Sequence, residues 1–104
     1  MANKLCCLVP QEHFLFLSRD KELTGEAYRV LMVCYGNLEG GNIIRLRNVD
    51  ISESLGMNRA SVSRAIKILT SKGIISKVKE FGKPKHYRLN SNYFLKCKVI
   101  KDNQ

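Results

Sequence analysis

The sequence predicts a small α+β domain, and three observations indicate this class. Apolar residues recur at helical spacing in three segments, later segments alternate as strands do, and a glycine turn separates the last two helices. A chain of 104 residues has room for one hydrophobic core and not for two. About three helices followed by a β-hairpin is the order of a winged helix, whose wing follows a helix-turn-helix. We therefore interpret residues 1–104 as a single winged-helix domain.

Residues 1–22 are interpreted as an N-terminal arm and as a candidate for dimerisation. Their apolar run at residues 13–17 fits either a short strand or a buried helical turn. The next segment is predicted to be a helix that begins after the capping residue Thr24 and ends near Gly36 and Asn37. Its apolar stripe consists of Ala27, Val30, Leu31, Cys34 and Leu38. Cys34 is therefore expected to be a small core residue.

Residues 48–73 are predicted to form the helix-turn-helix. A turn at residues 40–42 and a short strand at residues 43–47 come before it. A brief helix at residues 49–55, with Asn48 as its expected cap, ends at the Gly56-Met57-Asn58 break.

The second helix of the motif has the strongest helical pattern in the chain. It is predicted over residues 59–72, with Asn58 as its cap and Gly73 as its stop. Four apolar residues with the spacing i, i+3, i+4 and i+7 form its core face, namely Val62, Ala65, Ile66 and Leu69.

Residues 74–90 are predicted to form the wing. Strands at residues 74–79 and 85–89 flank a tip that contains Gly82 and Pro84. We expect Ile75, Tyr87 and Leu89 to be core residues, His86 to be a polar surface residue, and Phe81 to pack in the turn rather than act as a wedge in DNA. Residues 91–104 form a tail in which residues 95–99 alternate like an edge strand.

The positive charge is confined to the second half of the chain. Residues 1–55 hold 6 basic and 7 acidic side chains, whereas residues 56–104 hold 12 basic and 2 acidic ones. Such an asymmetry indicates a face that binds a polyanion, with nucleic acid and anionic lipid as the usual candidates. A solubilising surface is the alternative, and the confinement of the charge makes it less favoured.

The helix at residues 59–72 has one wall for the core and one wall of short polar and cationic side chains. No acid occurs between Arg59 and Lys79. The N-terminal turn of such a helix reaches base edges in the major groove of double-stranded DNA. We expect Arg59, Ala60 and Arg64 to read bases. Phosphate contacts are expected from Asn58, Ser61, Ser63, Lys67, Lys79, Lys83 and Lys85.

The hairpin supports the same interpretation, because Lys77, His86 and Arg88 accompany the three wing lysines. For a single charged helix, the simpler interpretation would be that the charged side chains only form a solvent-exposed face. The missing acids, the serines and the position after a glycine turn favour DNA.

Other classes of function have little support in the sequence. The four cysteines show no C-x-x-C spacing, so no metal site is expected. None of the common nucleotide-binding or hydrolase motifs is present, so we expect neither a cofactor nor an enzyme activity. No membrane association is expected, because no long apolar run and no signal-peptide pattern occurs. No small-molecule ligand is expected, because a single domain leaves no second domain to sense one. The expected location is the cytoplasm, and the resemblances described next imply that of a bacterium or of the host of a mobile element.

The segment from Val49 to Ile66, continued by Leu69, Gly73, Ile74 and Ile75, resembles the helix-turn-helix core of bacterial winged-helix regulators. It is similar to the MarR and Crp–Fnr types. The resemblance implies base contacts at Arg59, Ala60 and Arg64, and phosphate contacts at Ser61 and Ser63. The sequence departs from the pattern at Ser52, where alanine is usual, and at Arg47, where a threonine cap is usual.

The segment at residues 87–94 adds a second resemblance, to plasmid replication proteins of the RepL type. These carry a similar segment after the wing, with a proline where this chain has Ser91. The resemblance implies a replication initiator or a plasmid-maintenance protein as an alternative function.

We expect a sequence-specific double-stranded DNA-binding protein that acts as a dimeric transcriptional regulator, a repressor by promoter occlusion. A winged helix that binds an acidic protein instead of DNA is a further alternative. A homodimer is expected because some apolar residues exceed the needs of one small core. These residues are Phe14, Phe16, Met32, Val33, Tyr93 and Leu95. Surplus core packing is the competing explanation for them.

Overall fold

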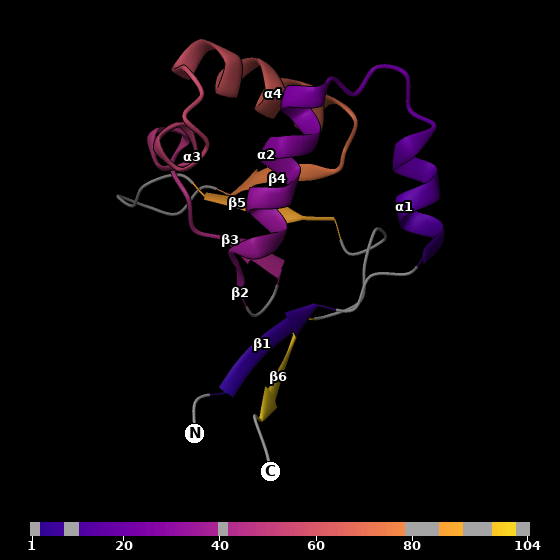
Figure 1. Ribbon diagram of the computed structural model, residues 1–104, viewed down its shortest axis with the longest axis vertical. Helices are drawn as coiled ribbons and strands as arrows, with labels where there is room; N and C mark the ends of the chain where they lie inside the picture. The colour runs from indigo at the N-terminus through magenta and orange to yellow at the C-terminus, as the bar shows by residue number, and fades with distance from the viewer. Residues whose placement is uncertain (1–2, 8–10, 40–41, 79–85, 91–96, 102–104) are drawn as a thin grey trace.

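The structure, a computed structural model, describes residues 3–7, 11–39, 42–78, 86–90 and 97–101. Its helices are α1 (Gln11–Ser18), α2 (Gly25–Gly36), α3 (Asn48–Leu55) and α4 (Arg59–Ser71). Its strands are β1 (Asn3–Cys7), β2 (Leu38–Glu39), β3 (Ile43–Ile44), β4 (Ile75–Val78), β5 (His86–Leu89) and β6 (Cys97–Lys101). Helices α2, α3 and α4 gather around an antiparallel sheet, while the β1–β6 pair lies at one end of the molecule together with both termini (Figure 1). The predicted α+β winged helix is confirmed.

Helix α2 forms the centre of the fold, as its sequence predicts. The Thr24 side chain caps it by accepting a 3.1 Å hydrogen bond from the backbone N–H of Ala27. The helix ends at Gly36, with Asn37 as its C-cap. The predicted stripe lies inward, because Ala27, Val30, Leu31 and Cys34 on the helix and Leu38 just beyond it are all buried.

The helix-turn-helix is formed by α3 and α4, and its start differs by one residue from the prediction. Asn48 is the first residue of α3 and not its cap. Arg47 occupies the N-cap position, where its backbone N–H donates a 2.9 Å hydrogen bond to the Asp50 carboxylate. An arginine side chain has no acceptor atom, so the cap depends on Asp50 and lies one residue earlier than the sequence indicates.

Two glycines end the helices of the motif. Gly56 adopts the left-handed conformation with φ of 63°, and its N–H donates to the carbonyl of Ser52 at the end of α3. Gly73, with φ of 73°, ends α4, and the N–H of Ile74 donates to the carbonyl of Leu69 over 3.0 Å. Residues other than glycine rarely adopt this backbone conformation, so the sequence itself indicates that both helices stop at these glycines.

The sheet has the order β2-β3-β5-β4, and all neighbouring strands are antiparallel. Strands β4 and β5 form the predicted hairpin, with Ile75 opposite Leu89 and Lys77 opposite Tyr87. The strand predicted at residues 43–47 is wrong in length, because β3 comprises only residues 43–44. Three residues after β3 ends, the N–H of Arg47 bonds to Asp50 at the start of α3.

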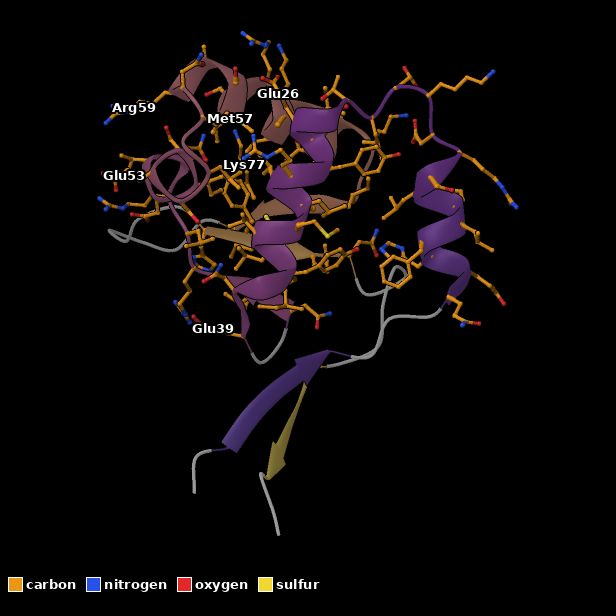
Figure 2. The ribbon with its side chains drawn as sticks, in the orientation of Figure 1. Glu26, Glu39, Glu53, Met57, Arg59 and Lys77 are labelled. Atoms are coloured by element: carbon orange, nitrogen blue, oxygen red, sulfur yellow. The ribbon has the colours of Figure 1, made fainter. Side chains whose placement is uncertain are left out.

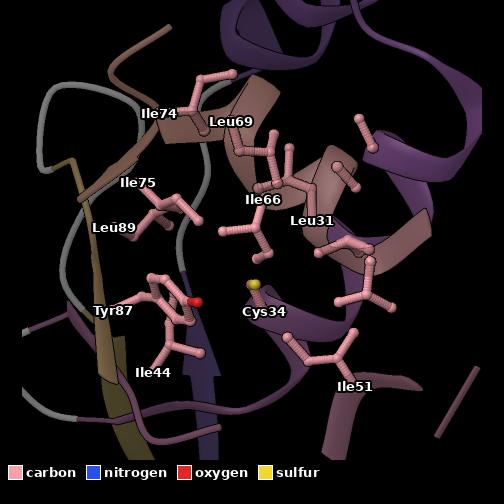
Figure 3. Close-up of a cluster of buried hydrophobic side chains, with 14 of the residues drawn as sticks. Leu31, Cys34, Ile44, Ile51, Ile66, Leu69, Ile74, Ile75, Tyr87 and Leu89 are labelled. Carbon is pink, nitrogen blue, oxygen red and sulfur yellow. The ribbon is translucent and has the colours of Figure 1, made fainter. Parts of the chain in front are cut away.

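The hydrophobic core lies between α2, the helix-turn-helix and the sheet. Leu31 and Cys34 of α2 meet Ile66 and Leu69 of α4 and Ile51 of α3 (Figure 3). Ile44, Ile75, Tyr87 and Leu89 approach the same cluster from the sheet, which confirms the predicted core roles of the last three (Figure 3). The predicted core face of α4 is also confirmed, since Val62, Ala65, Ile66 and Leu69 are buried.

His86 corrects the expectation of a polar surface residue, because its side chain is only 5% exposed. It belongs to β5, which has β3 on one side and β4 on the other. A central strand does not by itself bury a side chain, since Arg88 of the same strand is exposed. The burial of His86 depends on tertiary contacts, which are not visible in the local sequence.

The apolar run at residues 13–17 is part of a helix, α1, which adds a fourth helix to the predicted three. His13 and Leu17 are buried against the body of the protein. The side chain of His13 hydrogen bonds to the Tyr35 hydroxyl, and the hydroxyl of Tyr28 donates to the carbonyl of Leu17. These contacts fix α1 beside α2.

The tail strand predicted at residues 95–99 appears as β6 at residues 97–101 and pairs antiparallel with β1. Strand β1 was not predicted from the sequence. Among the described residues, no helix has the length and the hydropathy that a membrane span requires.

Candidate nucleic-acid interface

Helix α4 carries the exposed face on which the predicted contacts depend. Asn58 caps the helix, its side chain accepting a 2.8 Å hydrogen bond from the N–H of Ser61. From this start the helix turns its apolar stripe inward, and the hydrophobic contacts with α2 hold it in place. The predicted residues that remain exposed are Asn58, Arg59, Ala60, Ser63, Arg64 and Lys67. Arg59 projects away from the body of the protein at the first turn of the helix (Figure 2).

Ser61 does not lie on that exposed face, and this corrects its predicted position. Its side chain is only 4% exposed, and its hydroxyl accepts a hydrogen bond from the Arg64 guanidinium over 3.1 Å. Ser61 is adjacent to the core residue Val62 and lies at the flank of the apolar stripe, which explains its burial. The geometry makes Ser61 a partner of Arg64 rather than a surface donor.

The cations of the exposed face form no ion pairs among the described residues. Within that part of the chain, the acids that pair with cations do so elsewhere: Glu39 with Arg45, Asp50 with Arg47, and both Asp20 and Glu22 with Lys72. Arg59, Arg64 and Lys67 of α4 and Lys77 of β4 are in none of these pairs. A face with unpaired cations attracts an anion more strongly than one whose charges are already neutralised.

Lys72 at the end of α4 is occupied by a structural role. Its ammonium lies 3.1 Å from the Asp20 carboxylate and 2.7 Å from that of Glu22. The two carboxylates raise the pKa of Lys72. The N–H of Glu22 and the Lys72 ammonium together lower the pKa of Asp20. This cluster joins the segment between α1 and α2 to the end of α4.

A hollow of about 290 Å³ lies beside the exposed face of α4. Ser63, Ile66, Lys67 and Thr70 of α4 line one side of it, while Lys77 of β4 and Tyr87 of β5 line another. Asn48 of α3 completes the lining. The Tyr87 hydroxyl donates a 2.6 Å hydrogen bond to Oδ1 of Asn48, which ties the sheet to the start of the helix-turn-helix.

Of the residues that line this hollow, only Ser63 and Lys67 were predicted site residues, so Asn48 and Lys77 were missed. Strand alternation was the available signal for Lys77: it places Lys77 on the same face of β4 as the core residue Ile75, and β4 packs against α4. Asn48 gave no local signal. Its sequence context indicates a helix cap, and its neighbour Tyr87 lies 39 positions away.

The predicted wing contacts Lys79, Lys83 and Lys85 lie outside the described residues, as does Phe81. The lysine and the arginine of the hairpin that the structure describes, Lys77 and Arg88, are both exposed. They lie on opposite faces of the sheet, because Lys77 pairs with Tyr87 and Arg88 pairs with Ser76.

Cys34 is confirmed as a buried core residue. Burial raises the pKa of its thiol to about 12, so the thiolate that binds metals and attacks electrophiles is not formed near neutral pH. The part of the chain that the structure describes contains no group of three or more His, Cys, Asp or Glu residues suited to a metal ion.

Comparisons with known proteins agree with this fold. A family described as winged helix-turn-helix DNA-binding matches residues 45–76, which span α3, the glycine turn, α4 and the start of β4. No curated protein matches the chain. A solved structure, that of the adhesin competence repressor (AdcR) from Streptococcus pyogenes, is similar to it with a TM-score of 0.54 and 22% sequence identity.

The similarity covers 78% of this chain and 57% of the repressor chain. At this level of identity the likeness shows the fold, and it extends the winged helix beyond the segment that the family matches. Residues 45–76 are thus similar to a family described as winged helix-turn-helix DNA-binding, and they lie within a larger winged-helix fold.

Proposed function

We propose that this winged-helix protein binds double-stranded DNA at a specific sequence and acts as a dimeric transcriptional regulator, a repressor by promoter occlusion. The observation that carries the proposal is the exposed face of α4. Arg59, Arg64 and Lys67 are exposed on it without ion pairs among the described residues, while the opposite face of the helix is buried. The function is binding, and we propose no enzyme activity.

In this proposal, α4 enters the major groove with its N-terminal turn. Arg59 and Arg64 read bases, since a guanidinium can bond to O6 and N7 of guanine, and Ala60 offers its methyl group to thymine. Asn58, Ser63 and Lys67 contact phosphates. Ser61 holds Arg64 through the 3.1 Å hydrogen bond and does not contact a phosphate with its side chain.

The dimer is proposed to form through α1. Its residues Phe14, Leu15 and Phe16 are 50%, 54% and 56% exposed, and Met32 of α2 is 48% exposed. Surplus core packing therefore does not account for Phe14, Phe16 or Met32. Val33 is half-buried, and Tyr93 and Leu95 lie outside the described residues. Two copies of one apolar face are self-complementary across a two-fold axis, which supports a second copy of this chain as the occupant.

Fragment selection from the source genome and its plasmids tests the proposal. Purified protein at about 150 mM salt should enrich a single inverted repeat that overlaps a promoter. The logarithm of the binding constant should fall against the logarithm of salt concentration with a slope of about −5 to −7, as expected for 6–8 neutralised phosphates.

Other outcomes point to other functions. Repeated direct sites in an AT-rich origin would indicate replication control and contradict the regulator. A flat salt response with every duplex would contradict DNA binding altogether and favour an acidic protein partner.

A further inference from the structure

We infer that the hollow between α4, β4 and the start of α3 is a seat for one phosphate of the DNA backbone, with Lys67 and Lys77 as its two cations. We call it the phosphate seat, formed by Asn48, Ser63, Lys67 and Lys77. The inference rests on the proposed function and goes beyond it, since it assigns a single phosphate to residues of three separate elements.

The positions of the seat residues follow from helix and strand geometry. Ser63 and Lys67 are one helical turn apart on α4 and therefore lie on the same face. Lys77 is directly opposite Tyr87 in the hairpin, so its side chain leaves the same face of the sheet as the Tyr87 ring. The hollow is where these two faces meet.

The charge of the seat favours an anion. Among the described residues, two lysines line it and no carboxylate does. Neither lysine forms an ion pair with any acid among the described residues. Two cations that share one hollow repel each other, and the attraction of both to an anion between them outweighs that repulsion. Because both lysines line one hollow, we expect them to share a single phosphodiester, which carries one negative charge.

The neutral donors of the seat are held ready for an acceptor. Tyr87 donates to Oδ1 of Asn48, which fixes the orientation of the amide and leaves the Asn48 NH₂ group as a donor. That NH₂ group donates to no other described residue. The Thr70 hydroxyl, in contrast, already donates within α4 to the carbonyls of Ile66 and Lys67. Ser63 therefore supplies the hydroxyl for the anion.

A DNA phosphate fits better than a free one, because the seat is continuous with the proposed base-reading face. Ser63 is adjacent in sequence to Arg64, and Lys67 follows one turn later on α4. A strand whose bases meet Arg64 has to run along this side of the helix. The seat would then fix how α4 is oriented in the groove without reading sequence.

The test uses the full chain with the variants Lys67→Gln, Lys77→Gln and the double variant, and with Lys21→Gln as the control. Lys21 is an exposed lysine between α1 and α2, so its variant makes the same change of charge away from the seat. Each single variant should weaken binding, and the factor should be the same for the selected site as for a random duplex. The double variant should reduce the salt slope by about 0.9 per bound protomer, as expected for one lost phosphate, whereas two separate phosphates would give about 1.8.

A scan with single methylphosphonates, which carry no charge, locates the phosphate. One position in each half-site should weaken wild-type binding and leave the double variant unaffected. A slope change of about 1.8, or a double variant that behaves like Lys21→Gln, would overturn the seat while DNA binding by the wild type stands. A further outcome combines two results: inorganic phosphate shifts the NMR signals of Lys77 and of the Asn48 side chain, and the double variant binds DNA as the wild type does. This outcome would assign the seat to free phosphate and overturn the inference. A wild-type protein that binds no duplex would overturn the proposed function and the seat together.

Discussion

Arg64 and Ser61 differ by three positions in the sequence, and the structure gives them different roles. Both were expected on the DNA side of α4, yet only Arg64 is exposed there. The buried Ser61 hydroxyl accepts from the guanidinium and limits how freely that long side chain moves. A partly held arginine loses less conformational entropy when it binds a base edge, so Ser61 supports recognition without touching DNA.

Arg64→Ala should therefore affect the preferred site and spare random DNA. We expect a loss of about 1–3 kcal/mol in binding free energy on the selected site, because the bidentate contact with a base is removed. Titrations with both duplexes at one salt concentration measure it. Lys21→Ala, which changes an exposed charge elsewhere, should leave both constants nearly unchanged. Equal losses on both duplexes would show that Arg64 does not read bases.

The ends of α4 follow from local chemistry, and its packing follows from its apolar stripe. Asn58 satisfies a backbone N–H at the first turn, and Gly73 adopts the left-handed conformation at the last. The contacts with α2 then set the direction of the helix. Lys72 adds a long-range contact at the C-terminal end, where it meets Asp20 and Glu22. The helix is thus anchored at both ends, with its exposed face between them.

Asn58→Ala should destabilise the protein in the absence of DNA. The loss of the cap is expected to lower the free energy of unfolding by about 1 kcal/mol, because the N–H of Ser61 loses its acceptor. Urea denaturation followed by circular dichroism measures the change. Asn58→Ser, which keeps a capping oxygen, should retain most of the stability. If the serine and alanine variants were equally destabilised, the cap would not be the cause.

The contact between Asp20 and Lys72 predicts a dependence of stability on pH. The N–H of Glu22 and the Lys72 ammonium lower the pKa of Asp20 in the folded state, so the ionised carboxylate stabilises the fold above the ordinary pKa of 3.8. This contribution is lost as the pH falls through that value toward the lowered one. The stability advantage of wild type over Asp20→Asn should therefore be present at pH 7 and shrink between about pH 5 and pH 2.

Urea titrations across this pH range measure the advantage. Glu26→Gln serves as the control, because Glu26 is in no ion pair among the described residues. A constant difference between wild type and Asp20→Asn at all pH values would contradict the proposed linkage.

At the scale of the whole molecule, the basic face and the apolar face belong to different elements. The cations proposed to meet DNA, Arg59, Arg64, Lys67 and Lys77, are on α4 and β4, whereas the exposed apolar side chains are on α1 and α2. Helix α1 lies beside α2 on the side away from α3 (Figure 1). A second copy could thus cover α1 while the recognition helix stays free to meet DNA. The Lys72 cluster connects the two regions, since it joins the segment after α1 to the end of α4.

Leu15→Glu should convert the proposed dimer to a monomer. Leu15 is 54% exposed, so a charge at this position spares the core and opposes burial against a second copy. Light scattering coupled to size-exclusion chromatography should report half the wild-type mass, and affinity for an inverted repeat should fall. Gln11→Glu adds the same charge to the same helix without removing an apolar side chain and should stay dimeric. Equal masses for wild type and Leu15→Glu would place any dimer interface elsewhere.

The sequence by itself determined the parts of this protein that depend on neighbours within one or two helical turns. Helices α2 and α4, their caps at Thr24 and Asn58 and the stop at Gly73 follow from hydrogen bonds and backbone preferences that reach only a few residues. The exposed face of α4 follows from the same periodicity, apart from Ser61.

Only the tertiary structure decided the features that depend on residues far apart in the chain. His86 is buried by tertiary contacts although Arg88 of the same strand is exposed, and Lys67 and Lys77 share a hollow because α4 packs beside β4. Asn48 meets Tyr87 across 39 positions, and the apolar residues of α1 stay exposed because only His13 and Leu17 of that helix face the core. Burial and charge proximity depend on which surfaces meet in three dimensions, and a local pattern does not contain that information.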